Sequence, residues 1–199
     1  MVKTIIVFKD GKEVSSGVTN TSSIMSSSIT QLCNSDTDLT IGSVCAAMID
    51  AKILVPDGIL NASVGDSFTV FREYDGTRGQ VGIFHAEKIT KSSANTYSIT
   101  GYDNVSLLDK DLTTWLSGLS DWPYRLDSFS RLVCEQCGLT LSIPDDLPNA
   151  DYLIPKFLAN GITGRKLMEW CGQIAARYVI AGSDGAIRFG WYSESTAAI

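Results

Sequence analysis

The sequence predicts an α+β protein in which a β-rich, barrel-like domain over residues 1–102 precedes an α+β domain over residues 103–199. Two observations predict this class. The first half carries short apolar runs separated by hairpin-turn dipeptides, which is typical of strands joined in series. At Asp103 the apolar spacing becomes helical, and two to three amphipathic helices and a hairpin follow. This second part is either an insertion or an incomplete second domain.

The opening strands follow from β-branched runs and turn residues. Residues 2–8 form an apolar run, and Asp10-Gly11 is a hairpin signal before a second run over 13–18. Residues 19–28 are rich in Ser and Thr, which leaves a loop or an irregular edge strand as alternatives. Apolar residues between 29 and 41 suggest strands around a polar tip. Residues 44–54 fit a helical and an alternating spacing, and the density of β-branched residues favours a strand.

A three-strand meander is the clearest part of the first half. Strands are predicted over 68–74, 80–90 and 96–102. Asp75-Gly76 and the polar residues 92–95 supply the two turns. Together with the earlier strands, the meander predicts a barrel or a sandwich.

The second half alternates helices with strands. Asp103, Asp127 and Thr163 are candidate N-caps of three helices, and Gly118 and Gly138 end the first two. A strand over 139–143 follows the second helix, and a hairpin over 177–181 and 186–192 follows the third. The second and third helix-plus-strand units share their apolar phase at an offset of 38 residues, either by internal duplication or by chance. The predicted apolar faces are Phe129, Leu132, Val133 and Cys137, and Leu167, Trp170, Cys171, Ile174 and Ala175.

Composition and charge exclude several classes of protein. The 16 Lys+Arg against 22 Asp+Glu give a net charge of −6, so nucleic acid is not an expected partner. No apolar run approaches the ~20 residues of a membrane span, and the N-terminal run is too short for a secretory signal. We therefore expect the chain to be made in a cytoplasm. Its five cysteines are expected to be reduced: Cys33, Cys45, Cys134, Cys137 and Cys171.

The candidate nucleophiles and metal ligands form no constellation. Cys134-x-x-Cys137 resembles half of a zinc or redox motif, but the chain offers no second pair, and both thiols fall in a predicted helix. Buried thiols are the simpler interpretation. His85 is the single histidine and falls in a predicted strand at the surface or rim of the barrel. A hydrolase based on histidine would depend on that residue alone.

The acidic pairs and tryptophans are explained equally simply. Asp36 and Asp38 resemble a fragment of a calcium loop that lacks its glycine and closing glutamate, so a solvated turn is expected. Neighbouring acids seldom span a catalytic cleft. We therefore predict no catalytic, cofactor-binding or metal-binding residue and no cofactor, and the binding residues stay undefined. The pairs Asp109 with Asp111 and Asp145 with Asp146 are neighbouring acids of this kind. The four tryptophans are expected to be core or interface anchors: Trp115, Trp122, Trp170 and Trp191.

Several short motifs together resemble one protein family. They are Tyr-Ser-Ile-Thr-Gly-Tyr-Asp-Asn at 97–104, Leu-Leu-Asp-Lys-Asp at 107–111 and Thr-Gly-Arg-Lys-Leu-Met-Glu-Trp at 163–170. A second group follows: Ile-Ala-Ala-Arg-Tyr-Val-Ile at 174–180, Asp-Gly at 184–185 and Ile-Arg-Phe at 187–189. Over residues 60–192 this pattern resembles the hub, or tail-tip, proteins of bacteriophages, prophages and related contractile particles.

The resemblance implies a structural role. Family members form homotrimeric rings at the distal end of the tail tube, with barrel-like domains and α+β insertions, and this region carries no enzymatic site. It implies a virion component that is assembled in the bacterial cytoplasm and that contacts tube, distal tail and tip proteins. Because the chain is shorter than a typical complete hub, the resemblance implies that it is the N-terminal part of one. A β-rich receptor- or carbohydrate-binding module and a cell-wall hydrolase are the alternatives.

Overall fold

The computed structural model describes residues 2–17, 22–32 and 40–191. The predicted turn around Asp36 and Asp38, as well as Cys33, lies outside them. The chain divides into two compact units. The barrel unit comprises Met1–Leu32, Ala46–Ser106 and Ala181–Ala186, and the α+β unit comprises Cys33–Cys45, Leu107–Ile180 and Ile187–Ile199.

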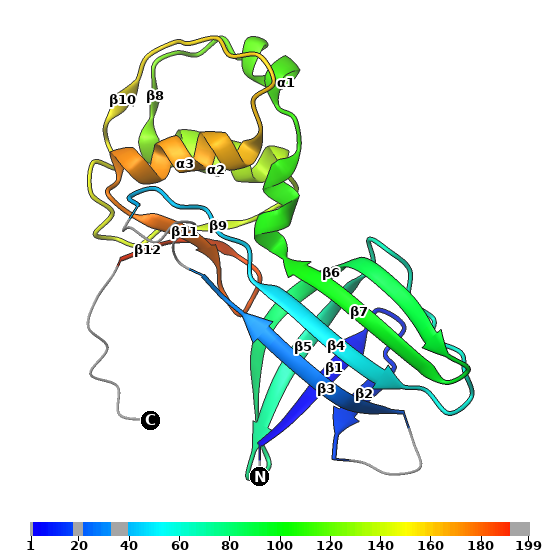
Figure 1. The fold of residues 1–199 in the computed structure, drawn as a ribbon. Helices are drawn as coiled ribbons and strands as arrows, with labels where there is room; N and C mark the ends of the chain where they lie inside the picture. The colour runs from blue at the N-terminus through cyan, green and yellow to red at the C-terminus, as the bar shows by residue number, and fades with distance from the viewer. Residues whose placement is uncertain (1, 18–21, 33–39, 192–199) are drawn as a thin grey trace. The chain divides into compact units, whose positions relative to one another are not determined.

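A closed barrel of seven strands forms the first unit (Figure 1). Its order is β1-β2-β3-β4-β7-β6-β5, so the predicted meander is present as three neighbouring strands and the barrel is the form adopted. The bounds are β1 Val2–Phe8, β2 Glu13–Ser16, β3 Ser23–Thr30, β4 Met48–Leu54, β5 Ser67–Tyr74, β6 Thr77–Ser93 and β7 Thr96–Asp103.

Alternation along the strands builds the barrel core. In β4, Ile49, Ala51 and Ile53 are buried while Asp50 and Lys52 between them are exposed. Successive side chains of a strand point to opposite faces, so one face of each strand fills the interior. The interior is almost entirely aliphatic and aromatic. Its largest members include Ile6, Phe8, Ile24, Ile49, Ile53, Phe68, Phe84 and Ile99.

Strand pairing around the barrel is uneven. β1 pairs with β5 over its whole length, from Val2 with Tyr74 to Phe8 with Phe68. β3 pairs with β4 from Ser23 to Thr30, with an irregularity between Ile24 and Ser26. On its other side, the described residues of β3 and β2 pair at two positions, in parallel, as far as Ile24. The barrel is therefore closed by a short contact at one end of β3.

The α+β unit contains three α-helices and two small sheets. After the 3₁₀ helix η1 (Asn104–Asp109) come α1 (Thr113–Ser117), α2 (Leu126–Gln136) and α3 (Gly164–Ile174). One sheet pairs β8 (Tyr124–Arg125) with β10 (Leu153–Ile154). The other has the order β11-β12-β9, where β9 is Leu141–Ser142, β11 is Tyr178–Ala181 and β12 is Ile187–Gly190. The predicted α+β class, with its helices and hairpin, is confirmed.

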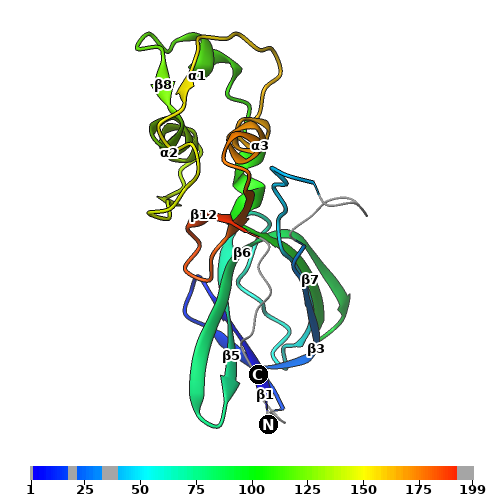
Figure 2. The same ribbon diagram turned by 90° about the vertical axis from the view of Figure 1, so that its left-hand side faces the viewer.

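The two long helices α2 and α3 run side by side in this unit (Figure 2). The predicted cap of α3 is confirmed, because Thr163 Oγ1 accepts a hydrogen bond from Lys166 N at 3.2 Å. The predicted cap of α2 is wrong. That helix begins at Leu126, so Asp127 lies in its first turn, where its carboxylate bonds Arg125 and Ser128.

Two further predictions about the helices need correction. The single helix expected from Asp103 to Gly118 is split into η1 and α1. Asp111 lies between them, where it makes a bridge to Thr163 and its carboxylate accepts from Thr113 N. On α2, Cys134 rather than Cys137 is fully buried, because Cys137 already ends the helix as its C-cap.

Candidate functional site: a motif junction and two surfaces

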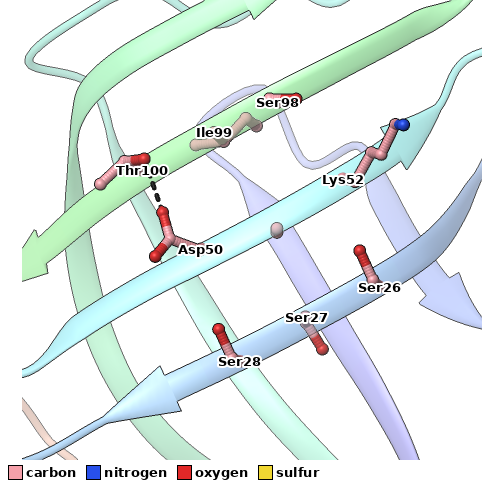
Figure 3. Close-up of a pocket in the computed structure, with 9 residues that line it drawn as sticks. Ser26, Ser27, Ser28, Asp50, Lys52, Ser98, Ile99 and Thr100 are labelled. Atoms are coloured by element: carbon pink, nitrogen blue, oxygen red, sulfur yellow. Dashed lines mark hydrogen bonds between the residues drawn. The ribbon is translucent and has the colours of Figure 1, made fainter.

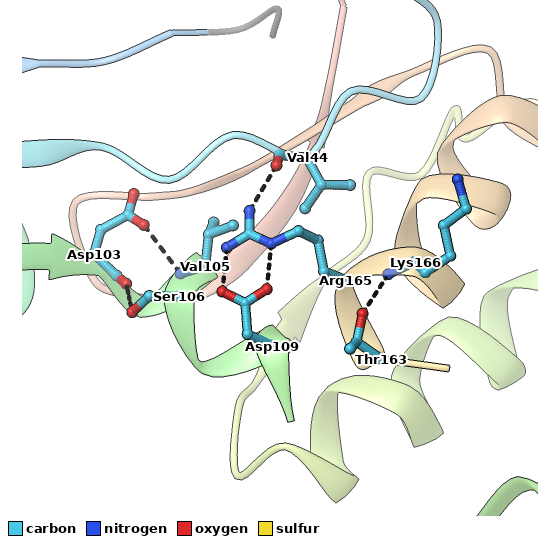
Figure 4. Close-up of polar contacts among 8 residues, drawn as sticks. All are labelled: Val44, Asp103, Val105, Ser106, Asp109, Thr163, Arg165 and Lys166. Atoms are coloured by element: carbon cyan, nitrogen blue, oxygen red, sulfur yellow. Dashed lines mark hydrogen bonds and ion pairs between the residues drawn. The ribbon is translucent and has the colours of Figure 1, made fainter. Parts of the chain in front are cut away.

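Two of the sequence motifs meet inside the α+β unit. Leu107–Asp111 covers the end of η1 and the two residues after it, and Thr163–Trp170 covers the N-cap and the first turns of α3. Arg165 Nε and Nη2 donate to the two carboxylate oxygens of Asp109 at 2.6 and 2.9 Å (Figure 4). Its third nitrogen, Nη1, donates to Val44 O at 2.7 Å. A bidentate arginine of this kind fixes orientation as well as distance, so it ties three separate segments together.

Backbone bonds complete this junction. Gly164 N donates to Lys110 O at 3.1 Å, and Leu112 N donates to Ile162 O at 2.8 Å. Gly164 is buried, and a Cβ there would lie 2.7 Å from Cys137 Sγ and 3.0 Å from Leu108 O. The glycine therefore allows the start of α3 to approach the end of η1 closely. The side chains of these motifs make the scaffold of the unit.

An open apolar groove lies against α2 and α3. It has a volume of about 170 Å³. Phe157 in its wall contacts the rings of Trp122, Phe129 and Trp170 at centroid distances of 5.4, 6.2 and 5.7 Å. Such edge-on pairs stabilise each other beyond their buried area. The lining residues are Phe129, Ile154, Phe157, Leu167, Trp170, Cys171 and Ile174.

The second surface is the outer face of β3, β4 and β7 in the barrel unit, which we call the polar face. It forms a shallow hollow of about 370 Å³ lined by small polar side chains (Figure 3). Thr100 Oγ1 donates to Asp50 Oδ1 at 2.6 Å, and Lys52 stands on the same strand as Asp50. The outward side chains of this face are Ser26, Ser28, Asp50, Lys52, Ser98 and Thr100.

The side-chain amide of Asn104 forms a hydrogen bond with His85. It lies half-buried in β6, with Nε2 2.8 Å from Asn104 Oδ1. Asn104 Nδ2 in turn donates to Gly185 O at 2.7 Å, which fixes the amide. Gln80 Nε2 donates to Ser183 O in the same turn. These contacts hold the Ala181–Ala186 segment within the barrel unit, and they give the imidazole a positioning role there.

Three of the cysteines, Cys134, Cys137 and Cys171, are weak nucleophiles in their surroundings. Burial raises the pKa of Cys171 to about 12, and it also raises the pKa of the Cys134 and Cys137 thiols. Since the thiolate is the nucleophile and the metal ligand, a raised pKa keeps the reactive form scarce. Cys134 Sγ contacts Met168 Sδ at 3.9 Å as a core group. Within the described ranges no three His, Cys, Asp or Glu side chains gather into a possible metal site.

The acidic pairs do not act as pairs. Asp109 bonds Arg165, whereas Asp111 accepts from Thr113 N, and this hydrogen bond lowers the pKa of Asp111. Asp145 and Asp146 are adjacent and exposed in the loop after β9.

The tryptophans divide between two environments. Trp122 is half-buried, with the Tyr124 and Phe157 rings at centroid distances of 5.0 and 5.4 Å, so it packs against Phe157, a residue that lines the groove. Trp191 is 50% exposed, and the Arg177 guanidinium lies 5.0 Å from its ring.

The polar face was not anticipated from the sequence. The alternation of Ala51 and Ile53 with Asp50 and Lys52 was a usable signal for the outward side of β4. The neighbouring strands could not be assigned, because their register is set by tertiary pairing. Over residues 2–17, 22–32 and 40–191, no helix combines the length and the apolar character needed to cross a membrane.

Comparison with known proteins reveals likeness in structure only. No family model matches the chain, and no curated protein matches it in sequence. The 43 kDa tail protein of prophage MuSo2 from Shewanella oneidensis aligns with 99% of the chain at a TM-score of 0.68 and 13% identity. A tail protein from Neisseria meningitidis MC58 aligns with 98% of it at a TM-score of 0.56 and 15% identity.

A third solved structure extends this set. Prophage tail protein gp18 from Listeria monocytogenes EGD-e aligns with 94% of the chain at a TM-score of 0.52 and 10% identity. The chain spans 57%, 52% and 50% of the lengths of these three proteins. All three are tail proteins, two of them from prophages, which agrees with the resemblance of the sequence motifs to phage tail proteins. The chain has the fold of bacteriophage and prophage tail proteins.

Proposed function

We propose that the chain is a structural subunit of a phage tail or phage-like particle, placed at the hub or tail tip, where it joins the tail tube to the distal end. The observation that carries this proposal is the alignment of 99% of the chain, hence of both units, with the MuSo2 tail protein. A match restricted to the barrel would be weaker support, since small barrels serve many functions.

The internal contacts support a structural role. Arg165, Asp109 and Gly164 stabilise the junction of η1 and α3, and His85 and Asn104 hold a turn of the barrel unit. Groups of the kind that serve catalysis elsewhere are thus engaged in maintaining the fold. We therefore propose that the chain acts by assembly and carries no enzymatic activity.

The proposed partners follow from the same role. In the particle the chain forms a homotrimer and contacts tube, distal tail and tip proteins, after assembly in the bacterial cytoplasm. Its net charge of −6 disfavours contact with nucleic acid. The apolar groove and the polar face are two surfaces that such neighbours could cover.

Immunogold labelling of purified particles tests the placement. Antibodies raised against residues 1–199 should label one end of the tail, opposite the capsid where a capsid is present. Labelling along the tail would indicate a tube protein, and absence of label from intact and from detergent-opened particles would refute a virion component. Label on side fibres would instead favour a receptor-binding module.

A further inference from the structure

Within residues 2–17, 22–32 and 40–191, the outer edge of β3 has a strand partner only at its start. β3 pairs with β4 from Ser23 to Thr30, whereas its pairing with β2 ends at Ile24. No other described strand pairs with the segment from Met25 to Thr30. An edge of this kind presents unpaired backbone N–H and C=O groups, which an extended strand from another chain can satisfy.

The exposure of the β3 side chains agrees with an open edge. Ser26 and Ser28 point to the polar face and Ser27 to the opposite side, as Figure 3 shows. Ser27 pairs with the buried Ala51 and therefore lies in the inward register, yet it is exposed. Met25 is 57% exposed. Solvent therefore reaches the inward side of β3 beside this edge.

Of the features that usually prevent strand addition, this edge has one irregularity, at Met25, and neither charge nor proline. Proteins protect free edges with lysine, proline, inward-pointing charges or bulges. Residues 23–30 contain no charged residue and no proline, and the one irregularity, between Ile24 and Ser26, precedes the serines. An uncharged partner strand can therefore approach without electrostatic repulsion.

The sequence of this edge is suited to a second copy of itself. Three serines, Ser26 to Ser28, are flanked by Met25 and Ile29, so the segment is nearly symmetric about Ser27. In an antiparallel pair centred on Ser27, Ser26 lies opposite Ser28 of the other copy and Met25 lies opposite Ile29. Like side chains then face like side chains, and a two-fold contact uses the same surface on both copies.

We propose that two copies of the chain associate through antiparallel pairing of their β3 edges, centred on Ser27. This pairing extends the sheet β3-β4-β7 of one barrel into that of the other and covers both open edges. It is a contact of the free protein, and it does not depend on the proposed place in the tail.

Charge substitution at the edge is the direct test. Purified residues 1–199 are measured by light scattering over a range of concentrations, as are the double variants S26K/S28K and S26E/S28E and their 1:1 mixture. The unsubstituted chain should form dimers that dissociate on dilution. Each charged variant should be monomeric, because like charges then oppose each other across the axis, and the mixture should form dimers again.

A control pair excludes a general effect of charge. S63K/S93K adds the same two lysines at exposed positions of the barrel unit outside β3 and the polar face, and it should dimerise like the unsubstituted chain. A chain that stays monomeric up to millimolar concentration would overturn the proposal. So would a charged variant that keeps the parent mass, or a mixture that stays monomeric.

Cross-linking supplies a second measurement at the axis itself. Cβ atoms of directly opposed residues lie about 4.5–5.5 Å apart, so S27C should form a covalent dimer on mild oxidation. S98C and the unsubstituted chain, which carries the natural cysteines, should not. Equal cross-linking of S98C would contradict the β3 contact. A trimer unaffected by S26K/S28K would refute this pairing and leave the proposed tail function standing.

Discussion

The two helices α2 and α3 occupy equivalent positions and bury different residues. They start 38 residues apart, at Leu126 and Gly164, and each has 11 residues. The buried positions of α2 are Leu126, Phe129, Ser130, Val133 and Cys134, and the same offset gives the buried positions of α3: Gly164, Leu167, Met168, Cys171 and Gly172.

The chemistry at these equivalent positions differs throughout. No residue is identical between 126–141 and 164–179. Where α2 has Leu126 and Cys134, α3 has glycines that other segments approach: Leu108 O near Gly164, and Gly42 near Gly172. The pattern of burial is thus set by the shared helix-plus-strand arrangement, while residue size is set by what packs on each helix. The shared phase of the two helices leaves internal duplication and chance as the alternatives.

Truncating a buried side chain at equivalent positions of α2 and α3 should have the largest effect on the free energy of unfolding. Phe129→Ala removes a buried ring of α2 and should lower the free energy of unfolding by about 4 kcal/mol, and Leu167→Ala at the equivalent place in α3 by about 3 kcal/mol. Urea denaturation measures both. Arg131→Ala, on the exposed face of α2, should change stability by less than about 0.5 kcal/mol. A small effect of Phe129→Ala would contradict the equivalence of the two buried faces.

Alanine substitution at one pair of equivalent positions should cost more stability in α3 than in α2. A Cβ at Gly172 would lie 2.9 Å from Arg177 O and 3.0 Å from Gly42 Cα, so Gly172→Ala should destabilise by about 2 kcal/mol. At the equivalent position of α2, Cys134→Ala should cost about 1 kcal/mol through lost contact with Met168. Thermal melting compares the pair, and a stabilised Gly172→Ala would show that no segment packs closely on α3.

Removing the N-cap should affect only α3. Thr163→Ala leaves Lys166 N without its side-chain acceptor and should cost about 1 kcal/mol, whereas Thr163→Ser should retain most of the stability. Arg125, at the equivalent place before α2, makes no capping hydrogen bond. Equal stability of the Ala and Ser variants in denaturant titration would argue against the cap.

The residues after the two helices should respond in opposite directions. Gly138 has φ +76° and Ala176 has φ +50° at the equivalent position. Gly138→Ala places a Cβ in the left-handed region and should destabilise by about 1 kcal/mol. Ala176→Gly should stabilise by up to about 0.5 kcal/mol, since glycine adopts this conformation readily. Chemical denaturation resolves the sign, and two changes of the same sign would contradict the parallel.

The ion pair in the first turn of α2 should make the stability of the protein depend on pH. A hydrogen bond from Arg125 lowers the pKa of Asp127, so this contact contributes stability above the ordinary carboxyl pKa that is lost as pH falls through the folded value. Asp127→Asn should therefore destabilise at pH 7 by less than about 1 kcal/mol, and the difference should shrink below about pH 4. A difference that grows in acid would reverse the assigned sign.

The sequence was most informative where local periodicity and tertiary burial agree. The β5-β6-β7 meander and the Thr163 cap were predicted, because alternation, turn dipeptides and a capping threonine act within a few residues. The break between η1 and α1 was missed, because it depends on Asp111 meeting Thr163 across 52 residues. The apolar groove and the open β3 edge were also missed, since they arise from the pairing of distant segments.

The number of copies per particle tests the central claim most directly. Quantitative mass spectrometry of purified particles, calibrated with an isotope-labelled chain, gives the ratio of this protein to the tail-tube protein. A homotrimeric ring at the tail end predicts three copies per particle, whatever the tail length. A copy number in the tens that scales with tail length, or the absence of the chain from intact particles, would contradict a hub at the tail tip.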